Sequence, residues 1–265
     1  MHAWSDTITH YCRDLQAAGR SPATIVTRRR WVQLLASAMP GSDPATITQD
    51  DVMGWMADNQ WMASTRRSVR QSLRSFFGWM HDSGLRSDDP SVGLPRPKVP
   101  RWQPRPLPES VYRQVLNETG HGIAHLAVLL AGSAGLRRCE IVAARREDLD
   151  ESGLWVVGKG GKRRLVPVSA ELRREITARP VGWLFPARWG DGHMHIDALG
   201  KMARRAMHWQ GSLHPLRHRF GTQAYRGTHD LRAVQEVMGH ASPATTAIYT
   251  AVSDDALRAA VAAAA

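Results

Sequence analysis

The stretch DLRAVQEVMGHASPATTAIYT, residues 230–250, holds two side chains able to do chemistry, His240 and Tyr249, nine positions apart. Working outward from it, three earlier segments carry basic side chains beside glycines or at the expected start of a helix. They are HPLR at 214–217, GKGGK at 158–162 and GLRRCEI at 135–141. In the last of these, Arg137 and Glu140 are three residues apart, the spacing of neighbours on one helix face.

Each segment also has an ordinary structural explanation. A single tyrosine on a helix usually belongs to a core or an interface, and the glycines around Lys159 are typical of a flexible turn. His214 and His218 are four residues apart, as metal-binding pairs on helices are, but no H-E-x-x-H pattern accompanies them. The run GKGGKRR joins two β-prone runs and lacks the G-x-x-x-x-G-K-S/T pattern of a Walker A loop. We therefore expect no metal and no other cofactor.

The chain length predicts two domains, because 265 residues exceed the usual size of one. Its 43% hydrophobic and 22% charged residues are typical of a globular protein and exclude a disordered one. Residues 1–87 are predicted to form a domain of four amphipathic helices around one core. Residues 109–265 are predicted to be mainly helical, with a small β-hairpin at 154–168 and a C-terminal tail helix. The proline-rich segment 88–108 predicts an extended, semi-rigid linker, for which a plain spacer is the simplest role.

Polar residues mark the expected starts of the four N-terminal helices. Ser21 precedes a proline at the first helical position, and Thr48 with Asp51 resembles a capping box. Ser5 and Ser64 are the expected caps of the first and fourth helices. In the second domain we expect helices at 108–118, 123–134, 197–208, 215–225, 230–238 and 244–251, and a last one from Asp254.

The positive charge of the chain predicts an acidic polymer as its partner. The formal net charge of +11 at pH 7 favours nucleic acid, although a solvated basic surface has the same signature. Basic residues recur every four positions along the fourth predicted helix, and residues 91–108 hold four basic side chains and no acidic one. The residues expected to contact DNA are Arg66, Arg70, Arg74, Arg96, Lys98, Arg101 and Lys162.

Nothing in the sequence directs the chain into a membrane. Its longest unbroken apolar run, residues 126–131, is far shorter than a membrane span. The N-terminus lacks the basic-then-apolar pattern of a signal peptide. The two cysteines, Cys12 and Cys139, exclude a disulfide scaffold and are typical of a reducing compartment. We expect a cytoplasmic protein without a membrane partner.

In their order and spacing the four motifs together resemble the tyrosine recombinases, the family of phage integrases and Xer-type recombinases. GLRRCEI, GKGGKRRLVP, HPLRHRFGT and DLRAVQEVMGHASPATTAIYT are similar to the family's catalytic domain. SPATIVTRRRWVQLL and STRRSVRQSLRSFFGWMHDSGL in the first domain resemble its SAM-like core-binding domain. The resemblance implies a mainly α fold in which a helical core-binding domain precedes a catalytic domain with a small β-hairpin or sheet.

The resemblance also implies six active-site residues, all present here: Arg137, Lys159, His214, Arg217, His240 and Tyr249. Tyr249 would attack phosphorus and leave a 3′-phosphotyrosine, with His214 as general base and Lys159 as general acid. Arginine forks are suited to the second negative charge that builds on the phosphate during attack. Glu140 would orient Arg137, with ordinary surface pairing as the alternative.

The implied function is site-specific DNA recombination, without metal or ATP. We expect double-stranded DNA core sites as the partner, four protomers on two sites, a monomer when free, and a possible accessory directionality factor. The integrase of a phage or other mobile element is the leading interpretation. The alternatives are a Xer-type enzyme that resolves DNA dimers, a type IB topoisomerase, and a non-catalytic DNA-binding regulator.

Both ends of the chain bear on that choice. The predicted core-binding helices begin by about residue 5, so no arm-binding domain is expected before them. The Ala-rich tail carries Leu257 and Val261 on one helix face. It has two interpretations: a helix that docks on a neighbouring protomer, or a degradation tag.

Overall fold

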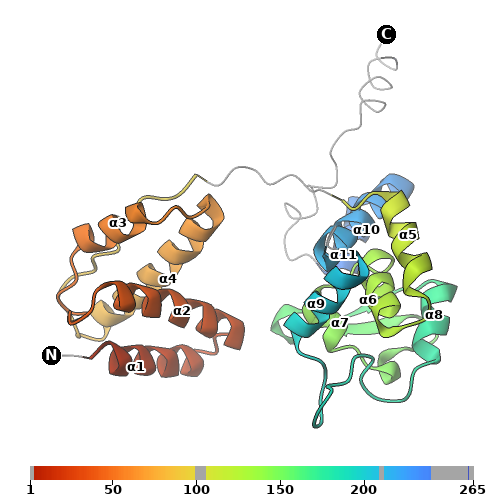
Figure 1. Ribbon diagram of the computed structural model, residues 1–265, viewed down its shortest axis with the longest axis horizontal. Coiled ribbons are helices and arrows are strands. Elements are labelled where there is room, and N and C mark those ends of the chain that lie inside the picture. Colours follow the sequence, from red (N-terminus) through yellow and green to blue (C-terminus); the bar gives the residue numbers. More distant parts are fainter. Residues whose placement is uncertain (1–2, 99–105, 209–211, 240–261, 263–265) are drawn as a thin grey trace. The chain divides into compact units, whose positions relative to one another are not determined.

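The computed structural model describes residues 3–98, 106–208, 212–239 and 262, and of Lys159 only the backbone. The chain forms two compact units, Met1–Trp102 and Gln103–Ala265 (Figure 1). The division between them falls inside the segment predicted as a linker.

Four helices make up the first unit: α1 (Trp4–Ala17), α2 (Pro22–Ala38), α3 (Gln49–Asp58) and α4 (Ala63–Asp82). Two expected caps are confirmed. The Ser21 hydroxyl accepts the backbone N–H of Thr24, and Thr48 with Asp51 forms a capping box. These contacts satisfy donors that the first turn of a helix leaves without partners.

The other two expected caps are wrong. Helix α1 begins at Trp4, before Ser5, because the Trp4 ring lies 5.9 Å from that of Phe76 and its Nε1 donates to Ser42. Helix α4 begins at Ala63, after Met62 and without a side-chain cap. Packing of the Trp4 side chain outweighs the local preference for serine at the start of α1. At the start of α4 Met62 is exposed, and no contact among the described residues explains the earlier start.

Aromatic side chains fill the core of the first unit. Tyr11, Phe76 and Phe77 are fully buried, and the Tyr11 and Phe76 rings meet edge to face at 5.3 Å. Trp79 packs on the same cluster and its Nε1 donates to Asp14 on α1. The long helix α4 thereby carries the apolar face that the other helices cover.

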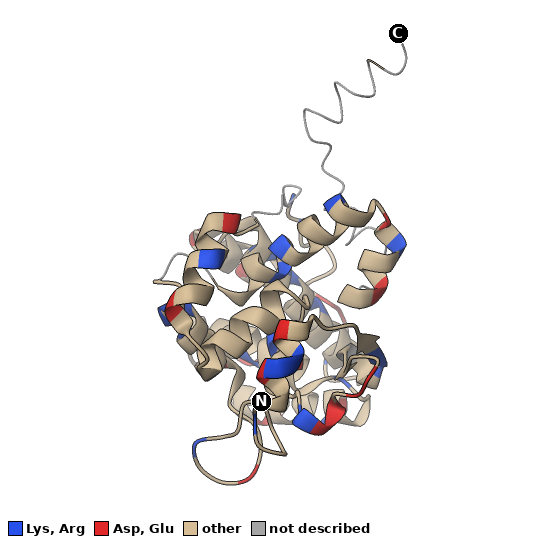
Figure 2. Ribbon diagram, turned by 90° about the vertical axis from the view of Figure 1, so that its right-hand side faces the viewer, with Lys and Arg blue, Asp and Glu red and all other residues tan. Residues whose placement is uncertain are grey.

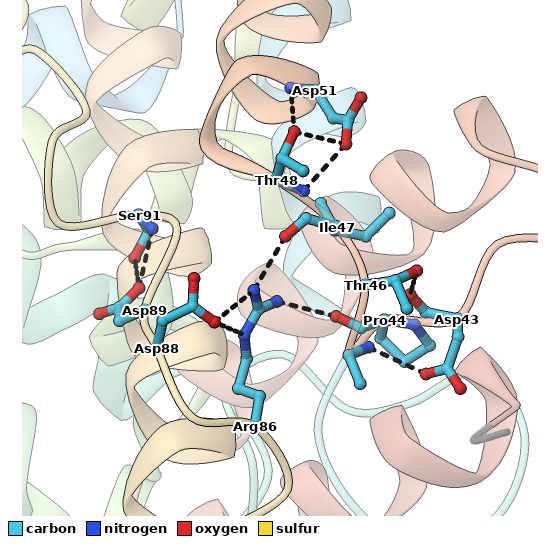
Figure 3. A network of polar contacts seen from close by, with 11 residues as sticks. Asp43, Pro44, Thr46, Ile47, Thr48, Asp51, Arg86, Asp88, Asp89 and Ser91 are labelled. Atoms are coloured by element: carbon cyan, nitrogen blue, oxygen red, sulfur yellow. Dashed lines mark hydrogen bonds and ion pairs between the residues drawn. The ribbon is translucent and has the colours of Figure 1, made fainter.

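The chain after α4 is tied to the first unit rather than extended, which corrects the expected start of the linker at residue 88. Arg86, whose side chain is only 4% exposed, donates to the carbonyls of Pro44 and Ile47 and pairs with Asp88 (Figure 3). Further on, Leu94 is buried in the helical core. Proline content alone does not reveal this, because the anchoring contacts are long-range.

The second unit surrounds one almost wholly buried helix, α6 (Ile123–Gly132), which lies among its neighbours in Figure 1. Its apolar side chains pack in one core with side chains of most of the other elements of the unit, whereas Val234 and Met238 of the last described helix form a smaller cluster with Phe220. The other elements include α5 (Glu109–Thr119), α7 (Arg138–Val142), the 3-10 turn η1 (Arg146–Asp148), α8 (Ala170–Thr177), α9 (Ile196–Ala206), α10 (Leu213–Thr228) and α11 (Leu231–Met238).

The expected β-hairpin is confirmed as a two-stranded antiparallel sheet, β1 (Leu154–Val157) and β2 (Arg163–Val166). Leu154 pairs with Val166, and the turn η2 (Lys159–Gly161) joins the strands. Helix α8 was not predicted, although the Ser169 hydroxyl caps it by accepting the N–H of Leu172. The helices expected at 244–251 and from Asp254 lie outside the described residues.

Acidic and basic residues occur together on most of the described helices. Figure 2 shows basic and acidic positions interspersed along the elements instead of sorted onto separate ones. Among the described helices, none combines the length and the apolar character that crossing a membrane requires.

Candidate active site

A buried carboxylate lies at the centre of the candidate site. Glu140 is in the first turn of α7, and its side chain is only 1% exposed. Its Oε2 accepts the backbone N–H of Arg137 at 2.8 Å, a capping contact at the start of the helix. A buried carboxylate needs cationic partners, because the loss of hydration is otherwise too costly.

Three arginines from separate parts of the chain supply those partners. Arg137 donates through Nη1 to Glu140 Oε1 at 2.8 Å. Arg164 on β2 makes a two-pronged pair, with Nη1 at 2.9 Å from Oε1 and Nη2 at 3.0 Å from Oε2. Arg217 on α10 places Nη1 at 3.8 Å from Oε2. We call these four residues the Glu140 cluster. Three guanidinium groups around one carboxylate leave it with an excess of positive charge.

The same three arginines hold the C-terminal end of α11. Arg164 Nε donates to the Val237 carbonyl at 2.8 Å, and Arg217 Nη2 donates to that of Met238 at 2.7 Å. The Gly239 carbonyl accepts from Arg137 Nη2 at 2.9 Å. The last carbonyls of a helix lack partners within it and carry partial negative charge, so cations stabilise them. The cluster thus fixes the point from which the chain continues to His240.

Glu140 is ionised in this setting. Burial by itself would raise the pKa of its carboxyl, but the hydrogen bond from Arg164, that from the Arg137 backbone and both positive charges outweigh burial and lower the pKa. The expectation of ordinary surface pairing for Glu140 is therefore wrong. Its contact with Arg137 is buried and shared with Arg164.

Two histidines lie side by side on α10, next to the cluster. The Nε2 atoms of His214 and His218 are 2.8 Å apart, so that one ring donates and the other accepts. His218 is buried. Burial first, and then the charges of Arg217 and Arg138, lower the pKa of His214. The neutral ring, which can accept a proton, is favoured.

The predicted catalytic residues are brought together as far as they are described. Arg137, Arg217 and Glu140 meet directly, and His214 is one turn before Arg217 on α10. Lys159 begins the turn of the hairpin whose strand β2 carries Arg164. Two predicted residues, His240 and Tyr249, lie outside the described residues.

Arg164 is a residue of the site that the sequence did not predict. The residue lies two positions beyond the GKGGK motif in a run of basic residues, and nothing local distinguishes it from Arg163. Its partners are 24 and 73 positions away, so only the fold brings them to it.

The predicted DNA-binding arginines on α4 are partly engaged within the first unit. Arg66 donates to two carbonyls just before the helix, one of them that of Trp61 at 3.0 Å. Arg70 Nε donates to the Leu94 carbonyl at 2.8 Å. Burial and then the charges of Arg74 and Arg96 lower the pKa of Arg70, which shows that three cations gather here.

The remaining predicted DNA contacts are exposed where they are described. They are Arg74, Arg96, Lys98 and Lys162; Arg101 lies outside the described residues. Arg74 is the exposed member of the α4 stripe, with only a long contact of 3.5 Å to a backbone carbonyl. These side chains are therefore available to a phosphate backbone, whereas Arg66 and Arg70 also have a structural role.

One group of metal-ligating side chains occurs among the described residues: His121, His125 and Glu175. Each already has protein partners. His121 Nδ1 lies 2.5 Å from Glu175 Oε1, and His125 Nδ1 lies 3.2 Å from the Leu116 carbonyl. Arg179 donates to the other Glu175 oxygen at 3.3 Å, and its permanent charge opposes a bound cation. We interpret the group as an ion-pair network that joins α8 to the turn between α5 and α6.

A helical unit precedes a unit in which arginines and histidines gather beside a β-hairpin, and this combination is typical of an integrase-like fold. The family model "Phage integrase family" matches residues 109–256. The chain therefore belongs to the phage integrase family and is a tyrosine recombinase, an enzyme that breaks and rejoins DNA.

Individual relatives resemble the chain over nearly its whole length. The tyrosine recombinase XerC of Chromobacterium violaceum is 32% identical in an alignment of 269 positions, which covers 93% of this chain and 90% of the relative. The integrase from mycobacterium phage Brujita is 31% identical, with 94% of this chain and 88% of that one covered and a TM-score of 0.51. A lambda integrase dimer bound to a core site matches with a TM-score of 0.74 over 91% of this chain and 96% of that one; at 15% identity it shows the fold alone.

Proposed function

We propose that this recombinase cuts DNA at a specific core site through a 3′-phosphotyrosine at Tyr249, as the integrase of a phage or other mobile element. One observation supports the proposed cleavage chemistry: three arginines share the Glu140 carboxylate and bind the backbone that leads to His240. An excess of fixed positive charge is what a phosphodiester needs as attack adds a second negative charge.

The proposed cleavage step conserves the number of phosphate ester bonds. The Tyr249 oxygen forms a bond to phosphorus while the bond from phosphorus to the 5′ oxygen breaks. His214 accepts the tyrosine proton, and Lys159 gives a proton to the departing 5′ oxygen. Arg137 and Arg217 stabilise the charge on the non-bridging oxygens. Because the covalent link keeps the energy of the broken ester, an incoming 5′-hydroxyl can reverse the step on another strand.

The direction of the His214 pKa predicts how cleavage depends on pH. The pKa of this ring is lowered below its usual 6.5, so the neutral form, which can act as a base, is the major one at pH 6.5. We expect the acid limb of the cleavage rate, where the rate falls to half of its plateau, to lie below pH 6.5. Replacing Arg138 by methionine removes one of the lowering charges and should move the acid limb to higher pH. Single-turnover cleavage of a nicked duplex, measured at pH values on both sides of 6.5, gives the acid limb of the parent protein and that of the variant. An acid limb above pH 6.5 in the parent protein would contradict the assignment of His214 as the base.

Exposed cations of the first unit are proposed to contact DNA phosphates. Replacing Arg74 or Arg96 by alanine should weaken binding to all sequences alike and lower the slope of log K against log salt by about 0.9 each. Filter binding at several salt concentrations measures the slope. Arg13, whose side chain is 73% exposed on α1, is the matched control and should leave it unchanged. An unchanged slope in both variants would exclude this face from the DNA interface.

A covalent trap tests the function itself. The protein is incubated with a pool of nicked genomic duplexes from which the short strand carrying the 5′-hydroxyl diffuses away after cleavage, and DNA attached to protein is then sequenced. We expect one enriched core sequence, absent with Tyr249→Phe although that variant still binds DNA. Attachment without sequence preference would instead indicate topoisomerase-like activity, and no attachment with intact binding would contradict the proposal.

A Xer-type role is the second candidate, favoured by 32% identity to XerC of Chromobacterium violaceum over 93% of this chain. The recovered core sequence separates the two roles. An integrase should join two separate DNA molecules that share the core but differ in their flanks. A dimer-resolving enzyme should delete between two identical copies of one site in a single molecule.

The proposed assembly is a tetramer on two core sites, formed from protomers that are monomeric without DNA. A lambda integrase tetramer bound to a Holliday junction has the same fold, at 15% identity and a TM-score of 0.73. Sedimentation of the protein alone and with core duplex tests this state. A stable tetramer without DNA would contradict it.

A further inference from the structure

We infer that Arg164 is a positioning residue for strand cleavage: it holds the hairpin that carries Lys159 in register with the arginines that bind the phosphate. The inference rests on the proposed function, because it concerns the proton that Lys159 gives to the 5′ oxygen.

The guanidinium of Arg164 lies between the backbone segments that lead into two predicted catalytic residues. A Cβ placed on Gly158, which precedes Lys159, would lie 3.5 Å from Arg164 Nη1. One placed on Gly239, which precedes His240, would lie 2.9 Å from the same atom, closer than real contacts allow. Gly239 also has a φ of +62°, where a side chain is strained. The backbone at Gly239 therefore approaches the guanidinium closely, whereas the backbone at Gly158 lies at ordinary contact distance from it.

The Arg164 guanidinium donates hydrogen bonds to three acceptor atoms of the protein. Nη1 and Nη2 hold the two oxygens of Glu140, and Nε holds the Val237 carbonyl. Because all three nitrogens of the guanidinium already donate to protein acceptors, few N–H groups remain for a phosphate. Arg164 therefore acts through other residues and not on the reacting atoms.

These contacts couple the hairpin to the rest of the site. Arg164 is on β2, one strand of the hairpin. Glu140 is in the first turn of α7, and Val237 is in the last turn of α11. The hairpin turn itself makes few anchoring contacts, since Gly160 and Gly161 have open space around them. Through its hydrogen bonds to Glu140, Arg164 links the hairpin to Arg137 and Arg217, the other two arginines of the Glu140 cluster.

A change of leaving group tests the inference. In DNA with sulfur in place of the bridging 5′ oxygen, the departing group is a thiolate. It can leave without a proton, because the pKa of the corresponding thiol is only about 8.5. We expect Arg164→Met to cleave ordinary nicked DNA about 100-fold more slowly and sulfur-bridged DNA within about threefold of the parent rate, as for loss of a general acid. Lys159→Ala should show the same rescue. Arg163→Met, a change at the exposed neighbouring arginine, should be unaffected on both substrates.

The outcomes separate the inference from the proposed function. If Lys159→Ala is rescued by sulfur but Arg164→Met is equally slow on both substrates, Arg164 does not position the acid and the proposed function stands. If neither is rescued, Lys159 is not the acid, and both the assignment and the inference fail. Should Arg164→Met not fold, Arg164→Lys keeps a cation beside Glu140 and should show a smaller defect, about 10-fold, with the same rescue.

Discussion

Glu140→Ala is expected to destabilise the second unit by about 3–5 kcal/mol, the usual cost of removing one partner from a buried ion pair. Three guanidinium groups would then lose their common carboxylate, and that of Arg217 is itself only 4% exposed. The carbonyls of α11 would remain their main partners. Urea unfolding followed by circular dichroism measures the loss.

Two further variants separate charge from shape. Glu140→Gln keeps the volume and one acceptor, so we expect a smaller loss. Glu236→Ala removes an exposed acid of α11 that pairs with Arg232, and its effect should stay within about 0.5 kcal/mol. A Glu140→Ala protein as stable as Glu236→Ala would contradict the central place given to this carboxylate.

The stabilisation from Glu140 also has a predictable pH dependence. Its folded pKa is lowered from the usual 4.5, so the ionised form is favoured by folding. The contribution is complete above pH 4.5 and is lost as the pH falls through the folded pKa. The difference in stability between the parent protein and Glu140→Gln should therefore shrink in acid.

Arg137→Ala is expected to lower the cleavage rate by about 100- to 1,000-fold while the fold persists, as for removal of one donor to a developing oxyanion. The fold should tolerate the change because Glu140 keeps Arg164 and Arg217 as partners. Arg137 is also the most exposed of the three arginines, at 34%, which suits a group that must reach a substrate. Single-turnover cleavage of a nicked core duplex measures the rate.

A matched arginine provides the control for that experiment. Arg145→Ala removes an exposed guanidinium of the same unit, which pairs with Glu147 and lies over the Trp183 ring. Its cleavage rate should stay within about twofold of the parent rate. If Arg137→Ala cleaves as fast as Arg145→Ala, Arg137 does not stabilise the transition state.

Much of the fold was predictable from short-range signals. The caps at Ser21 and Thr48 depend on residues three positions apart, and the hairpin depends on two β-prone runs around glycines. Helix α8 carried a signal that was missed: a serine before it, then Leu172 and Ile176 on one face, both buried. The false cap at Ser5 shows where tertiary packing, here that of the Trp4 ring on Phe76, outweighs local preference.

The candidate site was predictable only in part. The contact between Arg137 and Glu140 follows from their spacing of three residues. The contacts of Arg164 and of the α11 carbonyls join residues that lie 21 to 102 positions apart, which no periodicity in the sequence reports. The anchoring of residues 88–94 on the first unit was hidden for the same reason.

The most direct test of the account is to locate the covalent bond between protein and DNA. After trapping on a nicked core duplex, trypsin and nuclease digestion should leave a nucleotide on one peptide, which mass spectrometry can identify. We expect this peptide to be residues 233–258, with the nucleotide on Tyr249, the single tyrosine of that peptide. A nucleotide on any other residue would contradict it.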